Sequence, residues 1–152
     1  MQIQSTRFGL LEVDEDQIIS FPHGLPGFQG KRDFVFLPYQ NESPFAYLQA
    51  VDEPNLTFVI VEPFTFFQDY SFTLEDSVLT ELGLSDENPP KIFNIVRIPE
   101  IIKEMTANLL APIIINWQTR IAMQFILEKS PYTVRHSLFP QDSPGQEEKG
   151  GK

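Results

Sequence analysis

The sequence contains no cysteine among its 152 residues. This absence excludes a disulfide framework, a cysteine nucleophile and a thiolate metal site, and it suits a reducing compartment. The first residues lack the basic and apolar regions of a signal peptide. The longest apolar run, residues 109–115, contains a proline and is far shorter than a membrane span. We therefore expect a cytoplasmic protein that does not enter a membrane.

Side chains suited to catalysis near neutral pH are also scarce. The two histidines, His23 and His136, lie in a Pro/Gly turn and near the last expected strand, and neither has metal-ligand spacing. Asp14 and Asp16 loosely resemble a calcium loop, but the glycine and the distal glutamate of that motif are missing. The chain also lacks a glycine-rich phosphate loop and a nucleophile elbow. We expect no enzymatic activity, no cofactor and no bound metal.

Basic residues are absent from a long internal stretch. Residues 33–90 contain eleven acidic side chains and no lysine or arginine, in a chain of net charge -10. Residues 91–137 carry six basic side chains against three acidic ones. Such a field repels nucleic-acid backbones and steers a basic protein partner toward the chain. On charge alone, the acidity is also explained by a role in keeping the protein soluble.

What the chain does contain is typical of a β-rich globular domain, including 41% hydrophobic residues and fourteen phenylalanines. Short apolar or alternating runs separated by turn residues predict strands at 2–6, 10–14, 17–21, 33–37, 45–51, 57–61, 92–98, 110–116 and 121–127. We expect a mainly β protein, a small antiparallel β-barrel-like domain with one or two short helices, although a sandwich has the same spacing.

Helix signals occur twice. Thr73 followed by Asp76 is typical of an N-cap, residues 78, 79 and 82 have helical spacing, and Gly83 predicts the end of the helix. A second helical turn is expected from Pro99 to Met105.

The last twelve residues differ in composition from the rest of the chain. Residues 141–152 contain only Gln, Asp, Ser, Pro, Gly, Glu and Lys. Such a segment cannot bury enough apolar surface to fold. We expect a single domain at residues 1–140 followed by a disordered tail at 141–152.

Aromatic and acidic side chains occur together in the middle of the acidic stretch. Five rings lie within residues 64–72, and carboxylates flank them on both sides. Rings of this kind commonly fill a core, but five in nine positions cannot all lie on one strand face. Some should therefore lie at a rim or an interface. From the residues we predict a partner-binding face that includes Glu62, Phe66, Asp69, Tyr70, Glu75 and Asp76.

Three stretches of the chain resemble a known family. They are residues 21–28 (FPHGLPGF), residues 43–50 (SPFAYLQA) with 58–63 (FVIVEP), and residues 106–116 (TANLLAPIIIN). Together they are similar to the bacterial flagellar assembly factor FliW, in order from about residue 3 to residue 140. The long third stretch is the most specific.

The resemblance implies two protein partners. Members of this family bind the carbon storage regulator CsrA, a basic RNA-binding dimer that represses translation of flagellin messenger RNA, and they bind flagellin itself. Flagellin that accumulates would occupy the factor and free the regulator, so the factor acts as a partner switch. Asn108 and Asn116 of the third stretch are further candidate partner-binding residues, although both could instead satisfy turn backbone groups. Pro112 between them indicates a strand edge or a bulge.

Two other functions stay open at this point. A small-molecule-binding β-barrel requires a polar, ionisable lining in an internal cavity, which the mostly apolar strands disfavour. An RNA-binding barrel predicts salt-sensitive RNA binding by the isolated chain, which the net charge disfavours.

Overall fold

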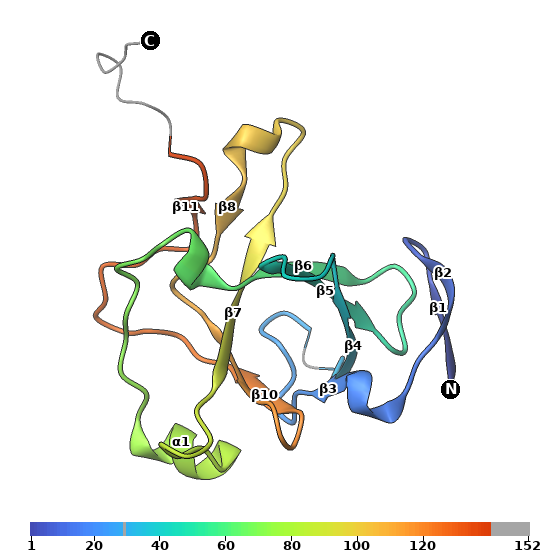
Figure 1. Cartoon of the computed structure of the whole chain (residues 1–152), viewed down its shortest axis with the longest axis horizontal. Helices are drawn as coiled ribbons and strands as arrows, with labels where there is room; N and C mark the ends of the chain where they lie inside the picture. The colour runs from blue at the N-terminus through green and yellow to red at the C-terminus, as the bar shows by residue number, and fades with distance from the viewer. Residues whose placement is uncertain (29, 141–152) are drawn as a thin grey trace.

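Seven strands of the computed structural model close into a β-barrel (Figure 1). Around the ring their order is β7–β6–β5–β4–β3–β10–β9, and β9 pairs again with β7. These strands are β3 (Ile18–Ser20), β4 (Asp33–Pro38), β5 (Phe45–Ala50), β6 (Thr57–Val61), β7 (Lys91–Arg97), β9 (Ile113–Asn116) and β10 (Ile121–Gln124). The structure describes residues 1–28 and 30–140, so the predicted tail at 141–152 lies outside the described residues. The prediction of a mainly β, barrel-like fold is confirmed.

The ring closes through one short seam. Ser20 of β3 and Ile121 of β10 form a single parallel register pair, whereas the neighbouring strands around the described ring pair antiparallel. The backbone N–H of Ser20 also donates a hydrogen bond to the carbonyl of Arg120 at 2.8 Å. Strands far apart in the sequence therefore meet at this seam.

The strand β7 belongs both to the barrel and to an extension of the sheet. Its residues 91–93 pair with β9, and its residues 96–97 pair with β8 (Thr106–Ala107), which in turn pairs with β11 (His136–Ser137). In Figure 1 the β7–β8 hairpin projects from the barrel at the top, and the separate hairpin of β1 (Gln2–Ser5) and β2 (Gly9–Glu12) lies at the right.

Side chains at alternate positions of the strands point inward and fill the barrel interior. Phe34, Leu48 and Ile60 are fully buried in the same cluster and come from three adjacent strands. Burial of each such side chain contributes roughly 1.5–3 kcal/mol to folding. The inner cluster is entirely hydrophobic and consists of Ile19, Phe21, Leu25, Phe34, Ala46, Leu48, Ala50, Ile60, Phe93, Ile113, Ile115 and Ala122.

A second core lies against the outer face of β5, β6 and β7. Val96 of β7 and Val61 of β6 point to this outer face, away from the barrel interior. The segments after β6 and after β10 cover these side chains. This outer cluster consists of Val61, Tyr70, Val96, Met105, Ala107, Leu109, Leu127 and Leu138.

The helix predictions need two corrections. The helix α1 spans Asp76–Leu82 and its N-cap is Glu75, so the cap lies two residues after the predicted cap, Thr73. Residues 71–75 have no regular secondary structure, and Phe72 and Leu74 pack against the body of the protein there. Gly83 ends the helix as predicted, in the left-handed conformation with φ of 69°.

The second predicted helix, from Pro99 to Met105, is wrong in extent. Only the 3-10 turn η3 (Ile102–Glu104) forms there. The chain turns back at this point so that β8 can pair with β7, and Ile101 and Ile102 remain more than half exposed.

Two strands differ from their predicted bounds by three residues at one end, the others differ by at most two, and two strands were missed. β9 starts at Ile113 because Pro112 has no N–H to donate to a ladder. β10 ends at Gln124, although the N–H groups of Phe125 and Leu127 still donate to the carbonyls of Pro112 and Leu110 at 2.9 and 2.8 Å. The missed strands, β8 and β11, have two residues each and show no periodicity.

The Asp14–Asp16 region forms a turn between strands. It contains the 3-10 turn η1 (Glu15–Gln17), and the N–H of Asp14 donates to the side-chain oxygen of Gln17 at 2.8 Å. Within the described residues, no group of three or more potential metal ligands comes together. In the same part of the chain, none of the helices has the length and apolar character that crossing a membrane requires.

Candidate functional site

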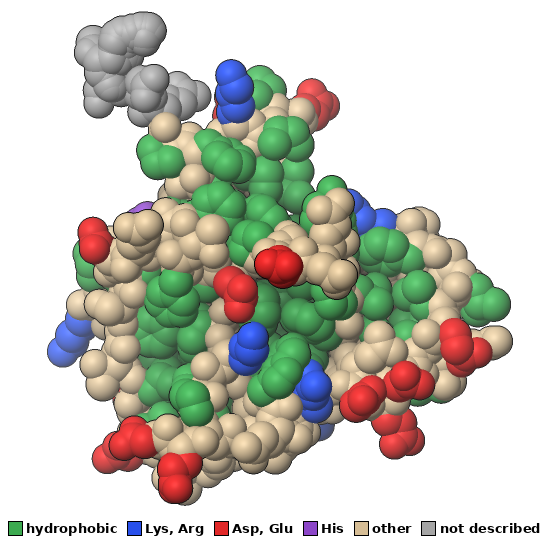
Figure 2. All heavy atoms as spheres, in the orientation of Figure 1, with side chains coloured by type: hydrophobic (Ala, Val, Ile, Leu, Met, Phe, Trp, Pro, Cys, Tyr) green, Lys and Arg blue, Asp and Glu red, His purple; other side chains and the backbone are tan. Residues whose placement is uncertain are grey.

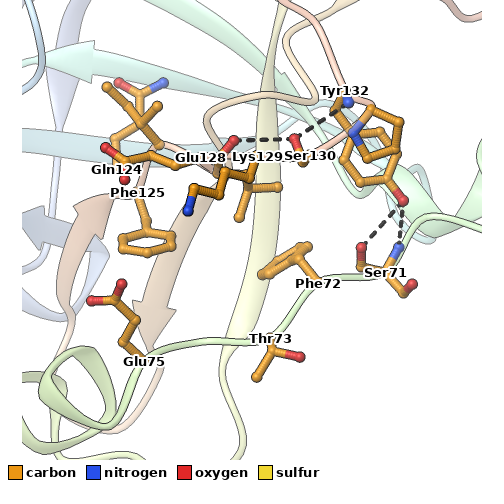
Figure 3. Close-up of a pocket in the computed structure, with 13 residues that line it drawn as sticks. Ser71, Phe72, Thr73, Glu75, Gln124, Phe125, Glu128, Lys129, Ser130 and Tyr132 are labelled. Carbon is orange, nitrogen blue, oxygen red and sulfur yellow. Dashed lines mark hydrogen bonds between the residues drawn. The ribbon is translucent and has the colours of Figure 1, made fainter.

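An open groove of about 860 Å³ runs beside the barrel (Figure 3). One wall is the segment 71–75, which leads into α1. The other is the stretch 124–132, which begins at the end of β10. Figure 3 shows Phe72 on the first wall and Phe125 on the second, with Glu75 at the lower edge. The groove joins parts of the chain that lie about fifty residues apart in sequence, at 71–75 and 124–132.

Hydrogen bonds from Tyr132 join the two walls at one end. Its hydroxyl accepts from the N–H of Ser71 at 3.0 Å and donates to the carbonyl of Ser71 at 3.2 Å. The ring of Tyr132 packs edge-on against Tyr70, with 4.7 Å between ring centroids. The walls are therefore held at a defined separation by backbone and aromatic contacts.

Tyr70 is the buried support of this arrangement. Its hydroxyl donates to the carbonyl of Leu109 at 2.7 Å and accepts from the side-chain amide of Asn94 at 3.2 Å. The same amide donates to the carbonyl of Asn108 at 2.8 Å. Burial raises the pKa of the Tyr70 hydroxyl to about 12, so the group stays neutral and able to donate at physiological pH.

The aromatic segment divides between core and surface, as its sequence indicates. Phe66 and Phe67 are half-buried against the outer cluster, beyond the 3-10 turn η2 (Pro63–Thr65), whereas Phe64 is 48% exposed. Phe66 contacts both Phe45 and Phe139 through its ring. The segment is a loop and not a strand, which is why rings from successive positions can point in several directions.

The predicted carboxylates lie on the surface in two places. Glu75 lines the groove, while Asp69 and Asp76 are exposed close to it in the chain, Asp76 as the first residue of α1. Glu62 lies apart from them, 3.7 Å from the amino group of Lys91. Of these carboxylates, the structure places Glu75 in the groove, leaves Asp69 and Asp76 exposed outside its lining, and places Glu62 at a second, smaller pocket.

The two predicted asparagines stabilise turns. The side-chain oxygen of Asn108 accepts from the N–H of Ala111 at 3.2 Å. Asn116 is buried, its amide donates to the carbonyl of Leu82 at 2.6 Å, and its oxygen accepts from the N–H of Gln118 at 2.9 Å. These bonds satisfy turn and helix-end backbone groups, which is the alternative role that the sequence left open.

The two histidines lie in ordinary surface settings. His23 is 2.5 Å from the carboxylate of Glu81, and both side chains are exposed. The ring of His136 accepts from the N–H of Thr133 at 2.9 Å.

Sequence reasoning missed the second wall of the groove. Ile126 is 52% exposed there, and Glu128 and Lys129 add charges of both signs. The signal was present in the sequence, because residues 121–127 are mostly apolar on both faces of the expected strand. Such a strand must meet a second apolar surface besides the barrel core.

The groove is suited to holding a segment of another protein. It combines exposed aromatic and aliphatic surface with carboxylates at its edge, and it is wide open to solvent. Its polar groups are the two separate carboxylates of Glu75 and Glu128, the amine of Lys129, several hydroxyls and one amide, all on side chains that reach the surface.

Comparison with known proteins gives a consistent result. The sequence model of a family described as "FliW protein" matches residues 2–138. The flagellar assembly factor FliW of Desulfitobacterium hafniense (strain DSM 10664 / DCB-2) is 49% identical over 152 residues, which is 100% of each chain. That of Heliobacterium modesticaldum is 41% identical over 140 residues, or 92% of each chain. A crystal structure of the flagellar assembly factor FliW is 38% identical with a TM-score of 0.85, covering 93% of this chain and 99% of the other.

Proposed function

The chain belongs to the FliW family of flagellar assembly factors, and on that premise we propose that it works as a partner switch in the cytoplasm. In this proposal it binds the carbon storage regulator CsrA, prevents that regulator from repressing flagellin messenger RNA, and is itself occupied by flagellin when flagellin accumulates. It acts by binding and catalyses no reaction.

The observation that carries the proposal is the groove with its acidic edge. Glu75 lines this open, partly apolar surface, and the exposed Asp69 and Asp76 lie within two residues of the same wall in the chain. They belong to the stretch 33–90, which holds eleven acidic residues and no basic one. A basic RNA-binding protein is attracted to such a face, and complementary charge raises the rate of encounter.

The same charge supports a mechanism of antagonism. An RNA strand that approaches the complex of the two proteins meets carboxylates beside the surface it needs, and it is repelled by them. Charge repulsion would therefore add to any direct overlap between the groove partner and the RNA site.

The proposal assigns different roles to the eight residues predicted from the sequence. The exposed Asp69, Glu75 and Asp76 make direct contact with the partner, and the half-exposed Phe66 and Glu62 contribute at the margin. The remaining three support the surface from within or from a turn, and they are Tyr70, Asn108 and Asn116.

The direct experiment is a calorimetric titration of the chain with CsrA. The charge-reversal variant Asp69→Lys, Glu75→Lys, Asp76→Lys should weaken binding about tenfold or more, since three attractive contacts become repulsive. The titration repeated after saturation with flagellin should show no heat if the two partners exclude each other.

A matched control distinguishes the effect of the groove-region carboxylates on affinity from the effect of net charge. Glu15, Asp16 and Glu100 are exposed carboxylates in the η1 turn and the β7–β8 connection, and their reversal to lysine changes the net charge by the same amount. If both triple variants lose affinity equally, or if the groove variant binds normally while folded, the groove is not the binding site. Heat in neither titration would reject the switch itself.

The alternative functions gain little support from the structure. The inner cluster is hydrophobic throughout, so it does not offer the ionisable lining that a small-molecule-binding barrel needs. The acidity of the chain argues against an RNA-binding barrel, and a titration of the isolated chain with RNA at low salt would test it.

A further inference from the structure

The turn that joins β9 to β10 is held by several hydrogen bonds, from both backbone and side-chain groups. The N–H of Arg120 donates to the carbonyl of Asn116 at 2.8 Å, and the side-chain oxygen of Asn116 accepts from the N–H groups of Gln118 and Thr119 at 2.9 and 3.2 Å. Asn116 is itself anchored to the end of α1. The turn therefore presents Trp117 and Arg120 in a set orientation.

Arg120 lies on the ring of Trp117 in a conformation that arginine rarely adopts. Its φ is 63°, in the left-handed region that favours glycine. Its guanidinium carbon is 4.0 Å from the centroid of the Trp117 ring, and the amino group of Lys91 is 5.4 Å from the same centroid.

The stacked guanidinium keeps its hydrogen-bond donors free. Stacking occupies the face of the group, while its N–H donors point outward in the plane, the geometry that matches a carboxylate. Among the described residues, Arg120 has no carboxylate within ion-pair distance and its guanidinium makes no hydrogen bond. Lys91 is engaged only weakly, at 3.7 Å from Glu62.

A pocket of about 270 Å³ adjoins these side chains. Phe36, Phe93 and Trp117 line it, together with the loop 40–44. Glu42 and Glu62 also line it. Of the two cations only Lys91 is among the lining residues, and Arg120 adjoins the pocket through its contact with Trp117. In Figure 2 basic and hydrophobic side chains lie next to each other near the middle of the face shown, over the region where β7 and β10 approach each other in Figure 1.

We propose that the basic patch, which we define as Lys91, Trp117 and Arg120, binds an acidic segment of a partner protein. A glutamate or aspartate of the segment pairs with the guanidinium of Arg120, and a neighbouring apolar side chain enters the pocket against Phe36 and Phe93. This surface is opposite in charge to the groove, so it selects a different segment or a different partner.

Charge distinguishes a peptide from a nucleic acid as the occupant. A short acidic segment can place one or two carboxylates at the patch without passing along the rest of the surface. A polyphosphate strand extends over many nucleotides and is repelled by a chain of net charge -10.

The chain contains a single tryptophan, which makes the patch its own reporter. The probe is a capped pentapeptide in which a leucine is flanked by two glutamates on each side, titrated into the full chain while Trp117 fluorescence is followed. A saturable change that weakens with added salt is the expected result. The pentapeptide with lysines in place of the glutamates should leave the signal unchanged.

Variants identify the group that binds, with affinity measured by calorimetry because the substitutions alter the fluorescence. Arg120→Gln should weaken binding of the acidic probe about tenfold, and Arg120→Lys, which keeps the charge but loses the planar fork, should be intermediate. The matched control is Arg7→Gln. Arg7 also lies on an aromatic ring, 4.9 Å from the centroid of Tyr47, and its removal should change affinity by less than about twofold.

Three results would overturn the proposal. The first is an absence of saturable binding at millimolar probe, and the second is an equal loss of affinity in Arg120→Gln and Arg7→Gln. The third is a hexameric oligothymidylate that binds the patch as well as the acidic peptide does. If Arg120→Gln does not fold, Arg120→Lys takes its place in the comparison. A weaker affinity than that of the wild-type chain then supports the proposal, and an equal affinity overturns it.

Discussion

The hydroxyl of Tyr132 and the backbone of Ser71 form a reciprocal pair of hydrogen bonds that closes one end of the groove, at 3.0 Å from the N–H and 3.2 Å to the carbonyl. The two residues come from opposite walls, sixty-one positions apart in the chain. One phenol group thus links the segment that leads into α1 with the segment that follows β10.

Removal of that hydroxyl should loosen the groove without disturbing the core. In Tyr132→Phe the ring still packs against Tyr70, but both hydrogen bonds are lost. We expect the free energy of unfolding to fall by about 0.5–1.5 kcal/mol and the amide hydrogen of Ser71 to exchange faster. Tyr39→Phe, at a side chain that is 54% exposed, is the control. Unchanged exchange at Ser71 would show that the pair does not hold the walls.

The buried phenol of Tyr70 predicts a loss of stability in alkaline solution. Its folded pKa of about 12 lies above the ordinary value of 10, so the folded state holds the proton more tightly than the unfolded state. The contribution is complete below about pH 10 and is lost as the pH rises toward 12. Tyr70→Phe should flatten this part of the stability profile, measured by urea unfolding at successive pH values. A profile as steep as that of the wild-type chain would contradict the assignment.

Asn116 should be among the most sensitive polar residues. Asn116→Ala leaves the buried carbonyl of Leu82 and the N–H of Gln118 without their partners, so we expect a loss of about 2–3 kcal/mol in chemical denaturation. The exposed Asn41→Ala should stay within about 0.5 kcal/mol of the wild-type chain. A small loss in Asn116→Ala would mean that water replaces the side chain there.

The end of α1 depends on glycine at position 83. Its φ of 69° is unfavourable for any side chain, while an added methyl group would lie 3.5 Å from the Asn116 amide, an ordinary contact. Gly83→Ala should therefore cost about 1 kcal/mol through backbone strain and not through a clash. Gly30→Ala is the matched control, because Gly30 has open space around it and no positive φ. Equal stability of the two variants in thermal unfolding would refute this reading of the helix end.

The barrel strands could be predicted from sequence because their side chains alternate between two environments. Residues 57–61 were assigned with the bounds that β6 has, and β4 and β5 differ by one residue at one end. Each of these strands is long enough for the alternation to appear. β8 and β11 are two residues long, and only the return of the chain onto β7 defines them.

The candidate site could be predicted on one side only. The acids and rings of residues 62–76 are conspicuous in the sequence, but which of them face solvent depends on the loop after β6 and on the segment that covers it. Tyr70 and Asp69 are neighbours in sequence, yet one is buried and the other exposed. No periodicity distinguishes them, since the segment has no regular secondary structure beyond the turn η2.

The parallel seam between Ser20 and Ile121 determines when the barrel can form during synthesis. The partner of β3 is made about one hundred residues after it, so a nascent chain that lacks β9 and β10 holds β3 to β7 as an unclosed sheet. The inner cluster takes Ile113, Ile115 and Ala122 from those last strands. Ring closure is thus a late and long-range step, and until the ribosome has released this part of the chain, the apolar face of the sheet stays open to chaperones.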